Sequence, residues 1–268
     1  MSADNLLNGV EDTLYIPLTA RIYVSEKFPE FFYDVKALSL KQHIPVADIE
    51  NNATEYFHMA SACRQQTIDN RIIRFLKENP QSNVVFLGAG LETAYNRIGD
   101  TTSNFYQVDL PNVIDLRKRV LGQADNETLI SADMFTLDWI EEINTSLPTM
   151  IAVSGVYQYF DENKIVEMIK KMKSLILKGE LVFDATNSKG LELANRYVAK
   201  TGNTDAQMYF SVDNPEEFAD KTGTKLIGVS GFFEEALKNC NGLKLKTKIY
   251  MYFADKLNRT LVVHLRFN

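Results

Sequence analysis

Short apolar runs alternate with longer segments in which apolar residues recur every three or four positions through the middle of the chain. The apolar runs predict buried strands, and the helical spacing between them predicts helices that cover those strands. Strands that are apolar on both faces are typical of a parallel sheet with helices on each side, so the pattern predicts an α/β fold. The runs lie, in chain order, at residues 84–87, 104–108, 127–130, 150–153 and 181–183.

The segment before the first strand has a different pattern. Residues 1–60 contain no strong strand signal, and their aromatic stretch at 27–34 is interrupted by a proline. We therefore expect residues 1–60 to form a mostly helical N-terminal cap and residues 61–268 to form the main domain. Apolar residues at helical spacing predict helix over 54–79, ending at the proline that follows.

The last third of the chain changes rhythm twice. Residues 186–240 lose the alternation, and we expect them to form an insertion near the ligand. From Leu243 to Phe253, apolar residues alternate with lysines and tyrosines, which is the period of a strand with one wetter face. Residues 261–267 predict a second strand, so the sheet is expected to close with an antiparallel hairpin.

Composition narrows the classes of function. The 268 residues carry a formal net charge of −6 and have a pI near 5.3, which argues against non-specific binding of nucleic acid. No apolar run is long enough for a spanning helix, and residues 1–5 lack the basic and apolar regions of a signal peptide. Cys63 and Cys240 support neither a disulfide framework nor a cysteine metal site. We expect a cytoplasmic protein that acts without a metal, nucleic acid or a membrane; its oligomeric state is not indicated.

A glycine turn follows the first strand directly. Gly88 and Gly90 stand between the apolar run 84–87 and a helix-like segment that begins near Leu91. Glycine lets the backbone approach a ligand closely, and the N–H groups at a helix start point outward. The turn predicts a site for a nucleotide-like ligand, although GxG pairs also occur in ordinary strand-to-helix turns.

Two carboxylates end the strands that follow. Asp109 ends the second strand, where it fits an acceptor for a ribose diol or an N-cap for the helix after Pro111. Asp133 ends the third, where it fits an acceptor for an adenine amino group, with Met134 packed on the base, or a surface turn residue. Carboxyl ends of parallel strands meet at one edge of a sheet, so these residues and the glycine turn are expected to lie together.

Several stretches around this turn form one larger pattern. They are Leu18-Thr19-Ala20-Arg21 with Phe28-Pro29, Ala62-Cys63-Arg64-Gln65-Gln66 with Leu87-Gly88-Ala89-Gly90-Leu91, and Gln107-Val108-Asp109-Leu110-Pro111. Together they resemble the leucine carboxyl methyltransferase-like group of class I S-adenosylmethionine-dependent O-methyltransferases, which includes bacterial polyketide-type members. The similarity covers most of the chain, and the spacing from Arg64 to Asp109 is its specific part.

The resemblance implies a fold, a cofactor and a set of site residues. The fold is a Rossmann-like, seven-stranded, mostly parallel sheet with a terminal antiparallel hairpin and an N-terminal helical cap. The cofactor is S-adenosyl-L-methionine, which leaves as S-adenosyl-L-homocysteine. Arg64 and Arg21 are placed on its methionine carboxylate, which a guanidinium fork suits. The other implied cofactor residues are Gly88 and Gly90 beneath it, Asp109 with the adjacent Leu110 at the ribose, Asp133 and Met134 around the adenine, and Ser154 beside it.

The chain also departs from the family pattern. Glu92 stands where the family usually has Asp, and Ala94 stands where it usually has Arg. Ser154 precedes Gly155 where the family usually has Glu beside the cofactor. The serine leaves a hydroxyl at that position and removes a negative charge near the sulfonium.

The acceptor side of the reaction is less defined. A carboxylate acceptor is already ionised and needs no base, whereas a phenol or alcohol gains from one. Tyr159, at a position that is aromatic in the family, is the candidate for positioning the acceptor. Tyr157 and His58 are weaker candidates, since each also fits an ordinary packed or capping residue.

These observations predict an O-methyltransferase that methylates a hydroxyl or carboxyl oxygen of a small molecule by in-line transfer. Methylation of a protein C-terminal carboxylate is an alternative within the same chemistry. A nicotinamide-dependent oxidoreductase is a second alternative, although Thr93 stands where its third glycine is expected. A non-catalytic protein that binds the cofactor is a third, because Ser154 departs from the family pattern.

Overall fold

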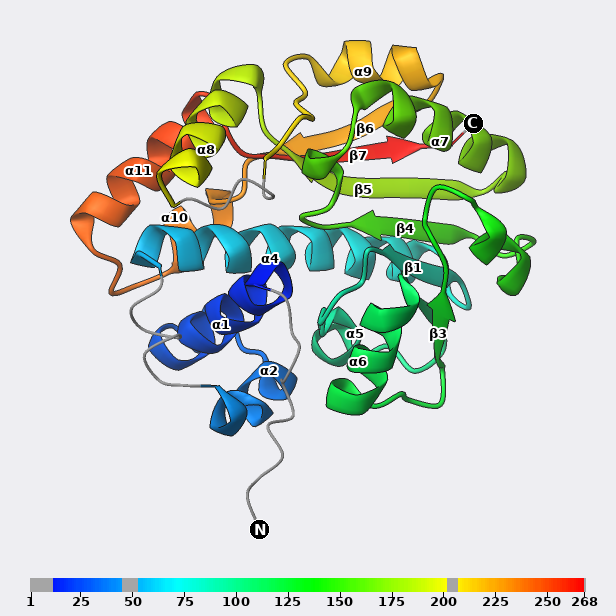
Figure 1. Ribbon diagram of the computed structural model, residues 1–268, viewed down its shortest axis with the longest axis horizontal. Helices are drawn as coiled ribbons and strands as arrows, with labels where there is room; N and C mark the ends of the chain where they lie inside the picture. The colour runs from blue at the N-terminus through cyan, green and yellow to red at the C-terminus, as the bar shows by residue number, and fades with distance from the viewer. Residues whose placement is uncertain (1–11, 45–52, 202–206, 268) are drawn as a thin grey trace.

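The computed structural model describes residues 12–44, 53–201 and 207–267. Within these ranges the chain forms one seven-stranded sheet in the order β3-β2-β1-β4-β5-β7-β6 (Figure 1). The first five strands in this order are parallel, and β7 is antiparallel to both of its neighbours. The predicted α/β fold with a closing antiparallel pair is confirmed. The strands are β1 (Asn83–Leu87), β2 (Asn104–Asp109), β3 (Glu127–Ser131), β4 (Thr149–Val153), β5 (Gly179–Ala185), β6 (Lys225–Ser230) and β7 (Leu261–Arg266).

Helices cover both faces of the sheet, as the apolar strands predict. Successive β1 residues point to opposite faces, so Val84 packs in one buried cluster and Val85 in the other. The cluster around Val85 includes α7 and α9, and the cluster around Val84 includes α4, α10 and α11. The helices are α1 (Asp12–Lys27), α2 (Val35–Ser39), α4 (Glu55–Glu78), α5 (Ala94–Ile98), α6 (Pro111–Leu121), α7 (Glu162–Leu175), α8 (Ser188–Thr201), α9 (Pro215–Thr222), α10 (Glu234–Asn239) and α11 (Leu245–Lys256), with short 3-10 turns η1 (Lys41–His43), η2 (Asp138–Glu142) and η3 (Tyr157–Tyr159).

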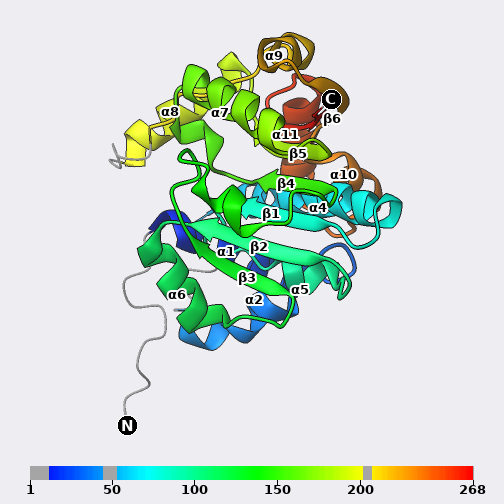
Figure 2. The same cartoon turned by 90° about the vertical axis from the view of Figure 1, so that its right-hand side faces the viewer.

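The N-terminal helices pack at one side of the sheet. Leu18 and Ile22 of α1 share a buried cluster with Leu116 and Val120 of α6, and α2 joins the same cluster. Figure 2 shows α1, α2 and α6 together beside β2 and β3. Because α1 also lies against α4, it is placed beside the carboxyl ends of the central strands.

One predicted strand is wrong. The stretch 243–253 contains most of the helix α11, and the strand that pairs with β7 is β6, which lies inside 186–240. The buried side of α11 consists of Thr247, Met251 and Ala254, spaced four and three residues apart, so two of its three inward residues are weakly apolar. Large apolar side chains such as Leu245 remain exposed, and they created the false alternation. The edge strand β6 is only half-buried, which explains its faint signal.

The parallel register determines where a site can form. Leu87 at the end of β1 is level with Val108 of β2 and with Val153 of β4. The residues that directly follow these strands therefore meet at one edge of the sheet, where open α/β sheets bind ligands.

None of the helices in the described ranges combines the length and apolarity needed to span a bilayer.

Candidate cofactor-binding site

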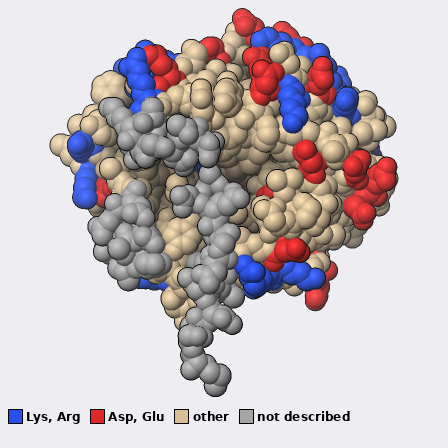
Figure 3. Space-filling view, in the orientation of Figure 1, with Lys and Arg blue, Asp and Glu red and all other residues tan. Residues whose placement is uncertain are grey.

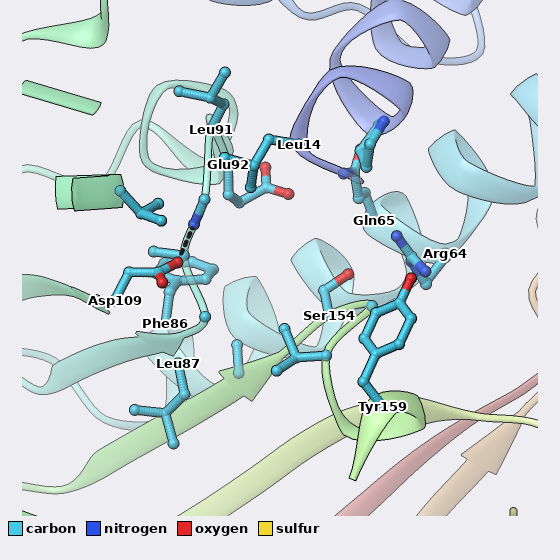
Figure 4. Close-up of a pocket in the computed structure, with 18 of the residues that line it drawn as sticks. Leu14, Arg64, Gln65, Phe86, Leu87, Leu91, Glu92, Asp109, Ser154 and Tyr159 are labelled. Carbon is cyan, nitrogen blue, oxygen red and sulfur yellow. Dashed lines mark hydrogen bonds between the residues drawn. The ribbon is translucent and has the colours of Figure 1, made fainter. Parts of the chain in front are cut away.

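A pocket of about 360 Å³ opens at the carboxyl ends of β1, β2 and β4 (Figure 4). Its volume lies within the usual range for small-ligand sites, roughly 300–1,000 Å³. In Figure 3 the charged side chains lie mostly toward the edge of the molecule, and the described residues between them are largely uncharged. The walls come from segments that are far apart in the sequence, namely residues 14–21, 64–65, 86–92, 109–113 and 152–160.

The glycine turn forms the floor of this pocket in a conformation that favours glycine. Gly88 has φ +66° and Gly90 has φ +47°, both in the left-handed region. A Cβ on Gly88 would lie 2.5 Å from Cγ2 of Val156, and one on Gly90 would lie 2.8 Å from Cδ2 of Leu14. The turn is therefore packed between the loop after β4 and helix α1, with no room for side chains.

Asp109 braces the turn from the end of β2. Its Oδ2 accepts from the Gly90 N–H at 2.8 Å, and its Oδ1 accepts from the Leu110 N–H at 2.8 Å. Figure 4 shows the first of these bonds crossing from Asp109 to the glycine turn. Asp109 and Leu110 both line the pocket. Their contact with a ribose stays a prediction.

The opposite wall presents buried polar atoms without partners. Arg64 Nε, Gln65 Oε1 and Ser154 Oγ are buried and have no hydrogen-bond partner among the described residues. All of these residues line the pocket, and such orphan groups are destabilising unless a ligand or water satisfies them. A guanidinium donor beside an amide acceptor and a hydroxyl fits the amino-acid end of S-adenosylmethionine, which carries a carboxylate and an amino group.

Arg64 is partly held by the protein itself. Its Nη1 donates to Asp184 Oδ2 at 3.3 Å, and the side chain lines the pocket. Tyr159 also lines the pocket, and Figure 4 shows its hydroxyl directed toward Arg64. The structure therefore brings Arg64, Ser154 and Tyr159 together beside the glycine turn.

Arg21 lines the pocket, but its guanidinium is surrounded by acceptors from the protein. Its Nη2 donates to the Leu91 carbonyl oxygen at 2.6 Å, and its Nε lies 3.2 Å from Asp34 Oδ2. Its Nη1 lies 3.8 Å from Glu92 Oε2. Because the side chain is 1% exposed, these acceptors supply the pairing that a buried charge requires. Its contact with the cofactor carboxylate stays a prediction.

Asp133 and Met134 do not line this pocket. Asp133 is exposed and accepts from the Phe135 N–H at 3.0 Å within its own turn. Met134 is 7% exposed and packs in the core cluster on the α7 side of the sheet. Their adenine contacts therefore stay predictions. Of the weaker candidates, Tyr157 is buried, which raises the pKa of its hydroxyl far above the ordinary range. His58 is buried and stacks on Tyr23, with ring centroids 4.2 Å apart, outside the pocket lining.

Glu92 is a pocket residue that sequence reasoning noted only as a departure. Its Oε1 accepts from the Thr93 N–H and from Arg97 Nη2, each at 2.7 Å. Burial alone would raise its pKa, but the positive charges of Arg97 and Arg21 prevail and lower the pKa to about 2. Arg97 also pairs with Asp34 and Asp69, so one ionic network joins α1, α4 and α5 beside the pocket.

Comparison with known proteins decides the family. The family model described as leucine carboxyl methyltransferase matches residues 17–173, which is more than half of the chain and includes Arg64, the glycine turn and Asp109. The chain belongs to the leucine carboxyl methyltransferase family. It is therefore a methyltransferase, and its methyl donor is S-adenosylmethionine. This family membership removes the support for a nicotinamide-dependent oxidoreductase.

Individual relatives agree with this assignment. The chain is 27% identical over 217 residues to the tetracenomycin polyketide synthesis O-methyltransferase TcmP of Streptomyces glaucescens, covering 80% of each protein. Among solved structures, a DUF574 family protein from Streptomyces avermitilis has a TM-score of 0.60 at 14% identity, covering 93% of this chain and 97% of that one. The magnesium protoporphyrin IX methyltransferase of Synechocystis PCC 6803, solved with bound S-adenosylhomocysteine, has a TM-score of 0.53 at 12% identity, covering 82% and 90%. At these identities the solved structures show a shared fold.

Proposed function

We propose that this methyltransferase methylates a hydroxyl or carboxyl oxygen of a small molecule. The observation that carries the proposal is the single pocket in which Arg64, the glycine turn and Asp109 surround one space, with Tyr159 at its wall. The match to a polyketide O-methyltransferase over 80% of both chains supports oxygen as the acceptor atom and a small molecule as the acceptor.

The residues present would hold the cofactor in distinct ways. Arg64 would bind the methionine carboxylate, Gly88 and Gly90 would lie beneath the cofactor, and Asp109 would accept from the ribose hydroxyls. Asp133 and Met134 are proposed to contact the adenine. Because neither residue lines the pocket, the adenine would have to extend beyond the pocket lining to reach them. When bound, S-adenosylmethionine supplies a methyl group made electrophilic by its sulfonium.

The chain's own contribution is alignment and exclusion of water. Tyr159 would orient the acceptor oxygen beside Arg64, and the apolar side chains of Leu14, Val156 and Phe160 would keep water out of the pocket they line. An ionised carboxylate acceptor would need no base, whereas a hydroxyl acceptor would gain from one.

Calorimetry tests the cofactor part of the proposal. We expect S-adenosylhomocysteine to bind the wild-type protein with micromolar affinity and NAD not to bind. Arg64→Ala should weaken S-adenosylhomocysteine by roughly 1.5–3 kcal/mol, the usual value for a hydrogen bond to a charged group. Arg74→Ala on the same helix is the matched control, because Arg74 is largely exposed and pairs only weakly with Glu78. Unchanged affinity in Arg64→Ala would remove Arg64 from the site.

A labelled methyl group tests the acceptor part. Tritiated S-adenosylmethionine is incubated with the enzyme and a panel of phenols, alcohols and carboxylic acids, and transfer into the small-molecule fraction is measured. Mild alkali separates the two products, since methyl esters release volatile methanol and methyl ethers do not. Label found in protein instead would favour the second candidate, a protein C-terminal carboxyl methyltransferase, which the name of the matching family supports.

A further inference from the structure

We infer that Asp184 is a positioning residue for the cofactor site, acting through Arg64 and the loop after β4. The inference rests on the proposed role of Arg64 at the methionine carboxylate. Asp184 is not among the residues that line the pocket, whereas its two partners, Arg64 and Gly155, both are. It is therefore placed to act on the pocket through other groups and not by touching the ligand.

The carboxylate of Asp184 links two separate elements. It lies near the end of β5, is 8% exposed, and is fixed by the pairing of β5 with β7 at Val262. Its Oδ1 accepts from the Gly155 N–H at 2.5 Å, and its Oδ2 accepts from Arg64 Nη1 at 3.3 Å. Each carboxylate oxygen thus holds one wall of the pocket, the loop after β4 and helix α4.

Gly155 provides the space in which the guanidinium of Arg64 lies. Gly155 has φ +72°, and a Cβ there would lie 2.9 Å from Nη2 and 3.2 Å from Cζ of Arg64. The guanidinium therefore rests against the glycine backbone, with Asp184 fixing one of its nitrogens. Since Arg64 has five N–H donors and its Nε has no partner among the described residues, donors remain for a carboxylate in the pocket.

The same tether reaches the floor of the pocket. The residue after Gly155 is Val156, whose side chain fills the space directly over Gly88. By holding the Gly155 amide, Asp184 also determines where Val156 meets the glycine turn. The carboxylate that pairs with Arg64 comes from β5. The side chain of Arg64 is only 14% exposed, and a largely buried charge needs such a counter-charge because an unpaired one is strongly destabilising.

Two ligands and one isosteric variant test the inference. Asp184→Asn keeps an oxygen that can accept from Gly155 but removes the charge that holds Arg64. The probes are S-adenosylhomocysteine and 5′-methylthioadenosine, which shares the adenosine and thioether but lacks the amino-acid end; dissociation constants come from calorimetry, by displacement for the weaker ligand. We expect Asp184→Asn to weaken S-adenosylhomocysteine about tenfold or more and 5′-methylthioadenosine less than about twofold.

The control is Glu180→Gln, at the other end of the same strand. Glu180 is also a paired carboxylate, 2.8 Å from both Arg266 and His264, but it lies outside the pocket lining. Its loss should leave both dissociation constants unchanged. Gly155→Ala is a second variant, expected to weaken S-adenosylhomocysteine selectively because it displaces Arg64.

Two results would overturn the inference. Unchanged binding of S-adenosylhomocysteine in Asp184→Asn would show that Arg64 does not need the carboxylate. Equal weakening of both ligands would show that Asp184 supports the fold in general and not the amino-acid end of the ligand. If the wild-type protein binds neither ligand, the proposed cofactor site fails instead, so the two failures are distinguishable.

Discussion

Glycines of the site contribute through their backbone conformation and through the close packing of other side chains against them. Gly88 combines a left-handed backbone, φ +66°, with a contact of 2.5 Å between a would-be Cβ and Val156. Gly99, at the end of α5, has nearly the same φ, +68°, but nothing within 4 Å of a would-be Cβ. The two glycines therefore separate the effect of backbone conformation from the effect of close packing.

This pair gives the first prediction. Gly99→Ala should lower the free energy of unfolding by about 1–2 kcal/mol, which is the cost of holding a residue with a Cβ in the left-handed conformation. Gly88→Ala should lower it further, because Val156 must also move, and should weaken S-adenosylhomocysteine at least about tenfold. Urea unfolding and calorimetry measure both quantities. Equal behaviour of the two variants would contradict the packing of the loop after β4 on the turn.

At the scale of elements, the pocket depends on how helices are tied together. Arg97 of α5 pairs with Asp69 of α4 and with Asp34 before α2, while Glu92 connects Arg97 to Arg21 of α1. These groups are buried, so each needs its partners, and the helices are fixed relative to the glycine turn. The network therefore explains how α1 is held over the pocket.

A pH experiment tests this network. The pKa of Glu92 is lowered to about 2 from an ordinary 4.5, because the attraction of Arg97 and Arg21 outweighs its burial. A lowered pKa stabilises the fold above about pH 4.5 and loses that contribution as the pH falls toward 2. Relative to the wild type, Glu92→Gln should be less stable at pH 7 by roughly 1–3 kcal/mol, with the difference shrinking below pH 4.5. Urea unfolding at several pH values measures this, and an undiminished difference at pH 3 would contradict the ionised pair.

At the scale of the whole molecule, a ligand in the pocket would join parts of the chain that are distant in sequence. The walls of the pocket come from α1, α4 and the loops after β1, β2 and β4. Binding to the folded state alone raises the free energy of unfolding by about 2.7 kcal/mol when the ligand is at 100 times its dissociation constant.

The corresponding prediction concerns thermal stability. For a chain of this size, S-adenosylhomocysteine at that concentration should raise Tm by about 5–10 °C. Differential scanning calorimetry measures the shift, with NAD at equal concentration as the control. A similar shift with NAD would indicate a general nucleotide effect, and no shift with either would remove the pocket as the cofactor site.

The sequence by itself determined the five parallel strands of the sheet, the glycine turn and the family. The strands and the turn depend on short stretches of sequence. A buried strand needs a continuous apolar run, and a tight turn against a ligand needs glycine. Because strand ends align in a parallel sheet, the sequence also indicated that the glycine turn, Asp109 and Asp133 meet at one edge. The register confirms this for Gly88 and Asp109, whereas Asp133 does not line the pocket.

Only the tertiary structure decided the rest. The helix α11 and the edge strand β6 depend on which side chains the neighbouring elements bury, and small residues such as Thr247 carry no hydropathy signal for this. The pairing of charges is equally hidden, since Arg64 meets Asp184 across 120 residues. The sequence shows which residues are charged, but packing decides which groups they pair with. Arg21, predicted to bind the ligand, therefore lies among acceptors of the protein itself.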